Sequence, residues 1–102
     1  MVTAYVTAPT DVAAELAQDL VERQLAACVN RIPCDSTYWW DDEVVCEEEA
    51  LLFVKTTADR YPALVDHLVK VHPYDVPCIE RFDEDEVFDA FQTWRDARVD
   101  SE

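Results

Sequence analysis

The sequence predicts an α+β fold in which helices cover a β-sheet. Three observations favour this class. Short segments rich in β-branched residues alternate with segments whose apolar residues repeat at helical spacing. Two long extended segments adjoin each other around Asp41-Asp42, which indicates an antiparallel hairpin. Pro9 and Pro73 mark the ends of a strand and of a helix, because proline interrupts both kinds of element.

A strand and a helix open the chain. The segment from Val2 to Thr7 is short, apolar and β-branched, and Pro9 closes it. Thr10 is a suitable N-cap for the next segment, because its hydroxyl can accept a hydrogen bond from the first helical turn. The apolar stripe of this helix ends near Leu25 and consists of Val12, Ala13, Leu16, Ala17 and Leu20.

A long hairpin occupies the middle of the sequence. A second strand begins at Ala27, passes through Pro33 and continues to Trp40. Asp41-Asp42 is the turn, since aspartate tolerates left-handed backbone better than most residues. Residues 44–57 form the returning strand, whose densest apolar stretch is 50–54. Strands of this length exceed the usual five or six residues, so the hairpin should project beyond a domain of 102 residues.

The second half of the chain repeats the pattern. Asp59 is a candidate cap for a helix that carries Pro62 in its first turn and stops at Pro73. Its stripe comprises Tyr61, Leu64, Val65, Leu68 and Val71. A fourth strand is expected over 76–82, and Asp83 with Glu86 resembles a capping box for a last helix. The expected buried face of that helix comprises Val87, Phe88, Phe91 and Trp94.

The order of these elements is β-α-β-β-α-β, followed by a C-terminal helix. This is the ferredoxin-like split βαβ arrangement, with a long hairpin between the second and third strands, in a single domain that spans residues 1–102. The arrangement by itself says little about function, because many unrelated activities use it.

Acidic residues dominate the composition. Eight Lys and Arg against 23 Asp and Glu give 8 − 23 = −15. Such a surface repels nucleic acid and anionic lipid, so neither is an expected partner. The acids are spread along the chain, which favours a surface adapted to concentrated salt, as in halophilic organisms, over a cation sponge. We find no membrane-spanning apolar run and no secretory leader, so we expect a cytoplasmic protein.

The cysteines and the absence of glycine exclude several kinds of site. Cys28, Cys34, Cys46 and Cys78 show no zinc-ribbon spacing, and we expect them to pack as small buried hydrophobic residues. A chain without glycine cannot carry a Walker loop, a dinucleotide fingerprint or an EF-hand loop. No set of residues typical of a catalytic triad is legible, so an enzyme is not expected.

The Trp39-Trp40 tip of the hairpin predicts self-association. Two adjacent indoles on an unpaired, projecting hairpin would form an exposed apolar patch and an open strand edge. Pairing with neighbouring subunits removes both problems. We therefore expect a closed homo-oligomer.

Several collinear stretches, which cover residues 3 to about 95, share a pattern. They are Thr7-Ala8-Pro9, Leu25-Ala26-Ala27-Cys28-Val29-Asn30, Ser36-Thr37-Tyr38-Trp39-Trp40, Lys55-Thr56, Tyr61-Pro62-Ala63-Leu64 and His72-Pro73-Tyr74-Asp75-Val76-Pro77. Together these stretches resemble the CutA family of divalent-cation tolerance proteins. The resemblance implies a homotrimer of ferredoxin-like subunits, similar to the PII signalling trimers. It also implies a cytosolic role in tolerance or response to divalent metals such as copper, with no catalytic reaction attached.

The same resemblance implies a metal site, but this chain departs from the pattern. Copper-binding members hold the metal through a Cys just before the Thr-Ala-Pro and through imidazole at the His-Pro-Tyr. Here the first position is Val6, so His72 remains, and Cys78 is a candidate thiolate for Cu(I). Glu43 and Cys78 also stand where the family usually has Lys and Glu, so one cation and one anion are lost together.

Each candidate has a structural alternative. His72 beside a helix-ending proline is also typical of a hydrogen-bonded structural residue, and Cys78 of simple packing. His67 lies at the edge of the helical stripe. The residues expected to line a ligand cleft between subunits are Tyr38, Trp40, Lys55 and Tyr74, although aromatic packing in a trimer needs no ligand. Two functions follow: a metal-binding tolerance protein, or a PII-like sensor of a small ligand.

Overall fold

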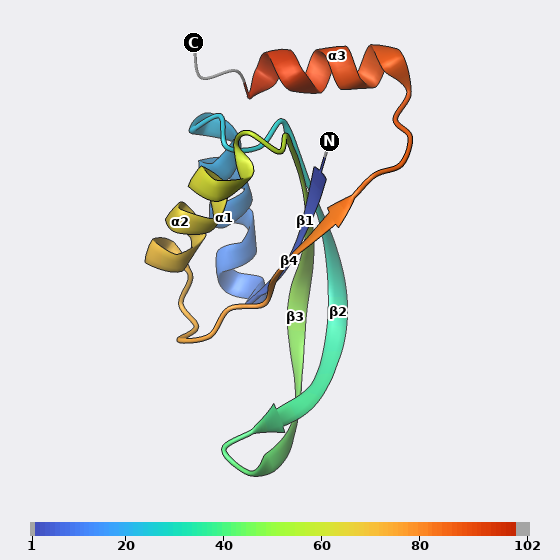
Figure 1. Ribbon diagram of the computed structural model, residues 1–102. Coiled ribbons are helices and arrows are strands. Elements are labelled where there is room, and N and C mark those ends of the chain that lie inside the picture. Colours follow the sequence, from blue (N-terminus) through green and yellow to red (C-terminus); the bar gives the residue numbers. More distant parts are fainter. Residues whose placement is uncertain (1, 100–102) are drawn as a thin grey trace.

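Four strands form one antiparallel sheet, and two of the three helices pack on the same side of it (Figure 1). The structure is a computed structural model and describes residues 2–99; Met1 and 100–102 of the expected domain lie outside these. The elements are β1 (Val2–Ala8), α1 (Thr10–Glu22), β2 (Cys28–Trp40), β3 (Glu43–Thr56), α2 (Tyr61–Val71), β4 (Ile79–Asp83) and α3 (Asp89–Arg98).

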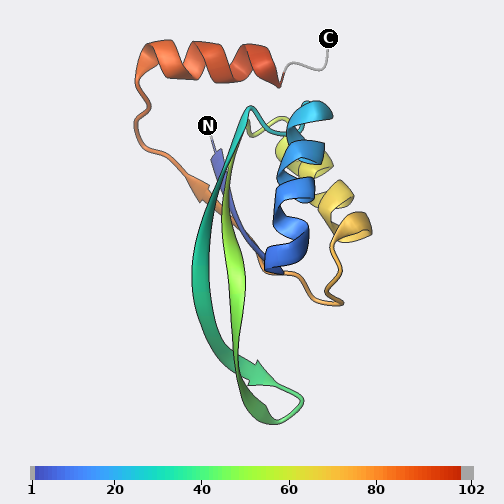
Figure 2. The same cartoon turned by 180° about the vertical axis from the view of Figure 1, so that it is seen from behind.

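The sheet has the strand order β2-β3-β1-β4, which confirms the ferredoxin-like prediction. β1 is central and pairs with β3 from Val2 opposite Thr56 to Ala8 opposite Ala50. On its other side β1 pairs with the short β4. The view from behind shows α1 and α2 side by side along the sheet, while α3 crosses one end of the molecule (Figure 2).

The core lies between the sheet and the α1–α2 layer. Alternate residues of the central strands face the helices and are buried, as the period of two in a strand requires. The expected stripe of α1 is confirmed, since Leu16 and Leu20 are buried. The core cluster comprises Ala4, Val6, Ala8, Ala13, Leu16, Leu20, Leu25, Ala26, Ala50, Leu52, Val54, Leu64 and Leu68.

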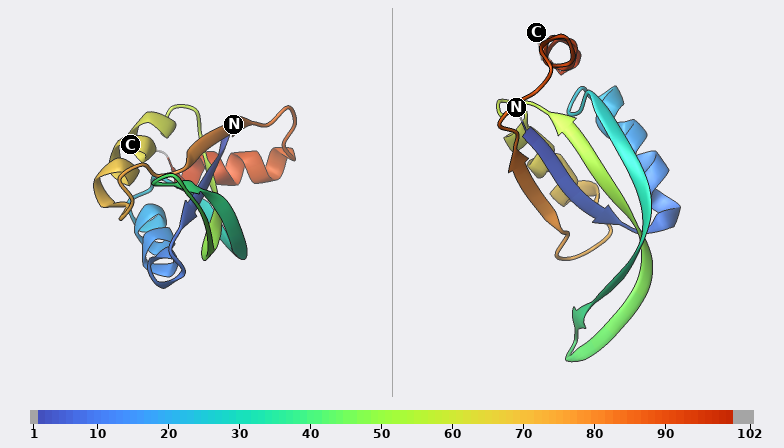
Figure 3. Two further views of the ribbon diagram at one scale, coloured as in Figure 1. Left: turned by 90° about the horizontal axis from the view of Figure 1, so that it is seen from below. Right: turned by 90° about the vertical axis from the view of Figure 1, so that its right-hand side faces the viewer.

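The β2–β3 hairpin overhangs the rest of the sheet (Figure 3). Its register runs without a break from Cys28 opposite Lys55 to Trp40 opposite Glu43. Because β1 stops at Ala8, the part of β3 from residue 43 to residue 49 has no β1 neighbour. Asp41 and Asp42 have φ of 50° and 62°, so they form the predicted turn. Positive φ at both central residues is typical of a type I′ turn, whose twist matches that of the flanking strands. Trp39, near the tip, is 72% exposed.

The expected helix caps at Thr10 and Asp59 were wrong. Thr10 is already inside α1, which begins after Pro9, and Arg60 rather than Asp59 precedes α2. None of the three helices has a side-chain cap hydrogen bond. The α1 helix also ends at Glu22, before Leu25, because Gln24 turns the chain with a left-handed φ of 58°.

The C-terminal part differs most from expectation. β4 begins at Ile79 rather than Val76, and Asp83 is its last residue instead of a helix cap. α3 begins at Asp89, and the aromatic residues expected on its buried face are exposed, with Phe88, which precedes the helix, at 79%. Arg95 is the side chain that α3 buries. Among residues 2–99, no helix is both long and apolar enough to cross a bilayer.

Candidate functional site

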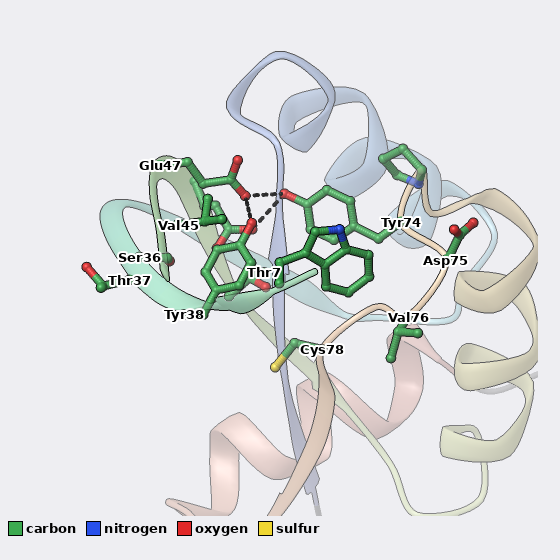
Figure 4. Close-up of a pocket in the computed structure, with 13 residues that line it drawn as sticks. Thr7, Ser36, Thr37, Tyr38, Val45, Glu47, Tyr74, Asp75, Val76 and Cys78 are labelled. Carbon is green, nitrogen blue, oxygen red and sulfur yellow. Dashed lines mark hydrogen bonds between the residues drawn. The ribbon is translucent and has the colours of Figure 1, made fainter. Parts of the chain in front are cut away.

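A pocket of about 810 Å³ opens between the hairpin overhang and the connection from α2 to β4. It forms where β1 ends and the hairpin continues alone. Four of the side chains singled out in the sequence converge on it: Tyr38, Trp40, Tyr74 and Cys78. Its other lining residues are Thr7, Ser36, Thr37, Val45, Glu47, Glu49, Pro73, Asp75 and Val76. Figure 4 shows hairpin residues such as Tyr38 and Glu47 facing Tyr74 of the α2–β4 connection.

Strand alternation places two carboxylates in the pocket. Glu47 and Glu49 are two positions apart on β3, so they share one face, opposite the face that Ala50 and Leu52 bury under the helices. Glu48, between them, points away and is exposed. Glu49 is only 5% exposed, because the α2–β4 connection covers it where β1 has ended.

Two phenols donate hydrogen bonds to these carboxylates. The Tyr74 hydroxyl donates to Glu49 Oε2 at 2.7 Å and also lies 3.5 Å from Glu47 Oε1. The Tyr38 hydroxyl donates to Glu47 Oε1, so both phenols meet at one acid (Figure 4). The hydrogen bond to Glu47 is the main reason that the pKa of Tyr38 is raised to about 12. Burial, followed by the bond to Glu49, raises the pKa of Tyr74 further above its usual range.

His72 lies beside the pocket and holds the connection in place. The side chain is buried, and its Nε2 lies 2.8 Å from the carbonyl oxygen of Thr7. The backbone N–H of Tyr74 donates to His72 Nδ1 at 3.1 Å. A carbonyl can only accept, so the neutral tautomer with the proton on Nε2 satisfies both contacts. This is the arrangement expected of a structural histidine, and coordination of a metal by His72 requires one of these bonds to break.

Cys78 lines the pocket as a half-buried thiol. Its Sγ lies 3.7 Å from Glu80 Oε1. Burial, followed by the nearby Glu80 charge, raises the pKa of Cys78, which disfavours the thiolate form that binds metals. The expectation of buried cysteines was wrong. Cys46 is exposed and the other three are half-buried, because Cys28, Cys34 and Cys46 lie on the overhang or on the sheet face without helices and Cys78 lies in the α2–β4 connection.

The remaining predicted residues lie elsewhere. Lys55 pairs with Thr3 and Cys28 near the opposite end of the sheet, six positions from Glu49, which is about 20 Å along a strand. Val6 is fully buried in the core. His67 contacts Asp19 at 2.6 Å and connects α2 to α1. Within residues 2–99 no group of three or more His, Cys, Asp and Glu side chains is arranged to hold a metal ion.

Sequence reasoning missed Glu47, Glu49 and Asp75 as lining residues. The available signal was the spacing of Glu47 and Glu49 on one strand face beside an apolar segment. In a chain with 23 acids this signal is weak, because most such pairs point to solvent.

The family model described as the CutA1 divalent ion tolerance protein matches residues 2–98. The chain belongs to this family. A curated CutA from Archaeoglobus fulgidus is 33% identical over 97 residues, which are 94% of this chain and 95% of that protein. A CutA homolog from Xenopus laevis is 48% identical over 75 residues, covering 72% of this chain and 50% of that protein. The chain thus spans about half the length of this vertebrate relative.

Solved CutA structures have the same fold. The Archaeoglobus fulgidus structure, described as a periplasmic divalent cation tolerance protein, matches with a TM-score of 0.93 and 32% identity, over 98% of this chain and all of that one. The apo structure of a PII-like CutA from Nostoc matches with a TM-score of 0.94 and 27% identity over 97% of each chain. The overhanging hairpin and the connection around His72 are therefore parts of a CutA-type, PII-like fold.

Proposed function

We propose that this CutA-family protein is a homotrimeric response module for divalent cations that binds its effector in the pocket at the hairpin base, without catalysing a reaction. The observation that carries the proposal is the convergence of Glu47, Glu49, Tyr38 and Tyr74 on one pocket. Carboxylate and phenol oxygens suit the binding of a ligand, and the imidazole beside the pocket, His72, contacts two backbone groups rather than a nucleophile.

Direct metal binding at this pocket should be weak. His72 has two backbone partners, Cys78 favours the protonated thiol, and Val6 supplies no ligand. Titration of the purified protein with Cu(I), Cu(II) and Mn(II) by calorimetry tests this part of the proposal. His72→Ala should remove the imidazole-dependent share of binding, and Cys78→Ser should weaken Cu(I) but spare Cu(II). Tight binding that survives both substitutions would place the metal elsewhere.

A PII-like sensor of a small ligand is the second candidate function. The pocket volume of about 810 Å³ favours it, because binding pockets for small molecules commonly measure about 300–1,000 Å³. A panel of nucleotides and other metabolites, followed by tryptophan fluorescence, to which Trp40 on the pocket wall contributes, separates this candidate from metal binding.

Trimeric assembly is proposed from the exposed indoles of the overhang and from the CutA-type fold. Light scattering should give a mass near three times 11.7 kDa, and a monomer at micromolar concentration would contradict it. We further propose a cytoplasmic location, on the ground that all four cysteines are free, as is usual in a reducing compartment. The Archaeoglobus relative described as periplasmic makes fractionation of the native cells the deciding test.

A further inference from the structure

We propose that the pocket at the hairpin base takes a small organic cation of the ammonium class. Its charge would be held by Glu47 and Glu49, and its alkyl groups by the rings of Tyr38, Trp40 and Tyr74. This inference rests on the proposed function, since it specifies the effector class of the same site.

The charged residues that line the pocket indicate the sign of the ligand's charge. Among the described residues that line the pocket are three acids, Glu47, Glu49 and Asp75, and no Lys, Arg or His. Among the charges that this chain contributes, an anionic ligand would meet only like charges there. A cation would meet two carboxylates whose bound neighbours are neutral phenols.

The burial of Glu49 strengthens this argument. A carboxylate that is 5% exposed has lost most of its hydration, and a charged group pays heavily for burial without an opposite charge. Tyr74 supplies a hydrogen bond at 2.7 Å but no positive charge. A cationic ligand would supply the positive charge that Glu49 lacks, next to a carboxylate that Tyr74 already orients.

The walls favour an organic cation over a bare metal ion. Three aromatic side chains and Val76 line the same pocket as the acids. Aromatic faces attract alkylammonium groups through cation–π contact, most strongly when water is excluded. They offer no ligand atoms to a hydrated divalent ion, which needs several oxygen donors at short distance. The volume of about 810 Å³ also far exceeds the room that one ion occupies.

Two probes of equal shape, one charged and one neutral, separate the contribution of the ligand's charge from that of its shape. Choline carries a trimethylammonium group, and 3,3-dimethylbutan-1-ol carries the uncharged tert-butyl group in its place. Calorimetric titration of each probe should be made in KCl at about 1 M, where a Debye length of roughly 3 Å screens general attraction to the acidic surface. Choline should bind at least about tenfold more tightly than the neutral probe, as a desolvated cation–π contact allows.

Two neighbouring glutamates provide matched variants. Glu47→Gln should weaken choline binding about tenfold, because one charge–charge contact with the ammonium group is lost, and leave the neutral probe unchanged. Glu48→Gln removes the same charge from the adjacent position, where the side chain points to solvent, and should change choline binding less than about twofold. Circular dichroism and the trimer mass of each variant would verify its fold. Glu47 is only half-buried, so this variant is better suited than one at Glu49.

The outcomes separate the inference from the proposed function. Equal binding of the two probes, or equal weakening by the two variants, overturns the ammonium assignment. Metal or nucleotide binding at the pocket, together with no choline binding, overturns the inference and leaves the proposed function standing. If metals, metabolites and choline all fail to bind and none changes the tryptophan fluorescence, both the inference and the proposed function are overturned.

Discussion

At the scale of single residues, the backbone of this chain carries conformations that glycine usually adopts. Gln24, Asp41 and Asp42 have positive φ, and the chain contains no glycine to relieve them. Gln24 lies after α1, where its N–H bonds to the carbonyl of Val21 and the N–H of Leu25 bonds to that of Leu20. The end of α1 is therefore specified by backbone hydrogen bonds in spite of an unfavourable side chain.

The variant Gln24→Gly should stabilise the protein. A left-handed conformation costs a residue with a β-carbon about 1–2 kcal/mol, and glycine avoids this cost but adds entropy to the unfolded chain. We expect a net gain of about 1 kcal/mol in the free energy of unfolding, measured by urea denaturation. Gln18→Gly, at an exposed position inside α1, is the control and should destabilise by a similar amount. Destabilisation by Gln24→Gly would contradict the assignment.

Asp19 should contribute stability that depends on pH. Its carboxylate accepts hydrogen bonds from His67 at 2.6 Å and Arg23 at 2.8 Å, and these partners lower its pKa. A group whose pKa is lower in the folded state stabilises the protein above its unfolded pKa of about 3.9, and the effect is lost as pH falls through the folded value.

The comparison of wild type with Asp19→Asn tests this dependence. The difference in the free energy of unfolding should be largest at neutral pH and shrink below about pH 4. Glu15→Gln on the exposed side of α1 is the control. A difference that stays constant down to pH 2, measured by thermal melts across the pH range, would show that Asp19 acts through packing alone.

At the scale of the elements, the sequence predicted the order of strands and helices but not all their ends. The stripes of α1 and α2 were legible because Leu16, Leu20, Leu64 and Leu68 recur at helical spacing. The caps were not, because the helix starts carry no side-chain cap bond and backbone geometry alone defines them. The pocket was predicted in part: aromatic residues beside prolines were visible, whereas Glu49 is buried only because β1 ends at Ala8.

α3 was misjudged because it buries a charge instead of its aromatic residues. The side chain of Arg95 is fully buried, with Nη1 3.7 Å from Glu84 Oε1, and its three guanidinium nitrogens lack hydrogen-bond partners within residues 2–99. Glu84 Oε1 also accepts a bond of 2.5 Å from the hydroxyl of Thr3. A hydrophobic pattern cannot reveal a buried ion pair of this kind.

Substitutions of Arg95 and of Glu84 should change the free energy of unfolding in opposite directions. Arg95→Met should leave the free energy of unfolding unchanged or raise it by about 1–2 kcal/mol, because a desolvated charge is replaced by an apolar side chain. Glu84→Gln should lower it by about 3 kcal/mol, because the buried guanidinium then loses the charge of Glu84 and keeps the exposed Asp96, 3.7 Å from its Nε, as its opposite charge. Arg98→Met at the exposed end of α3 is the control for urea denaturation. Strong destabilisation by Arg95→Met would indicate a partner for the guanidinium in the assembled protein.

At the scale of the whole molecule, charge opposes compaction and assembly. Each chain carries −15, so a trimer would carry 3 × −15 = −45. The melting temperature should rise steeply with KCl between about 0.1 M and 2 M, since the Debye length falls from roughly 10 Å to below 3 Å. Calorimetry with a near-neutral protein as reference checks this. A salt response no larger than that of the reference would reject adaptation to concentrated salt.

Pro33 has a further consequence for the outer edge of the sheet. It lies within β2, an edge strand, opposite Ala50, and the pairing with β3 continues on both sides of it. Its nitrogen, which has no hydrogen to donate, must therefore face outward. A further strand added to this edge would find a missing donor midway along β2 and could not pair along its whole length. One imino acid thus interrupts the template for fibril growth on a chain whose β2 edge is otherwise long and unpaired within the single subunit.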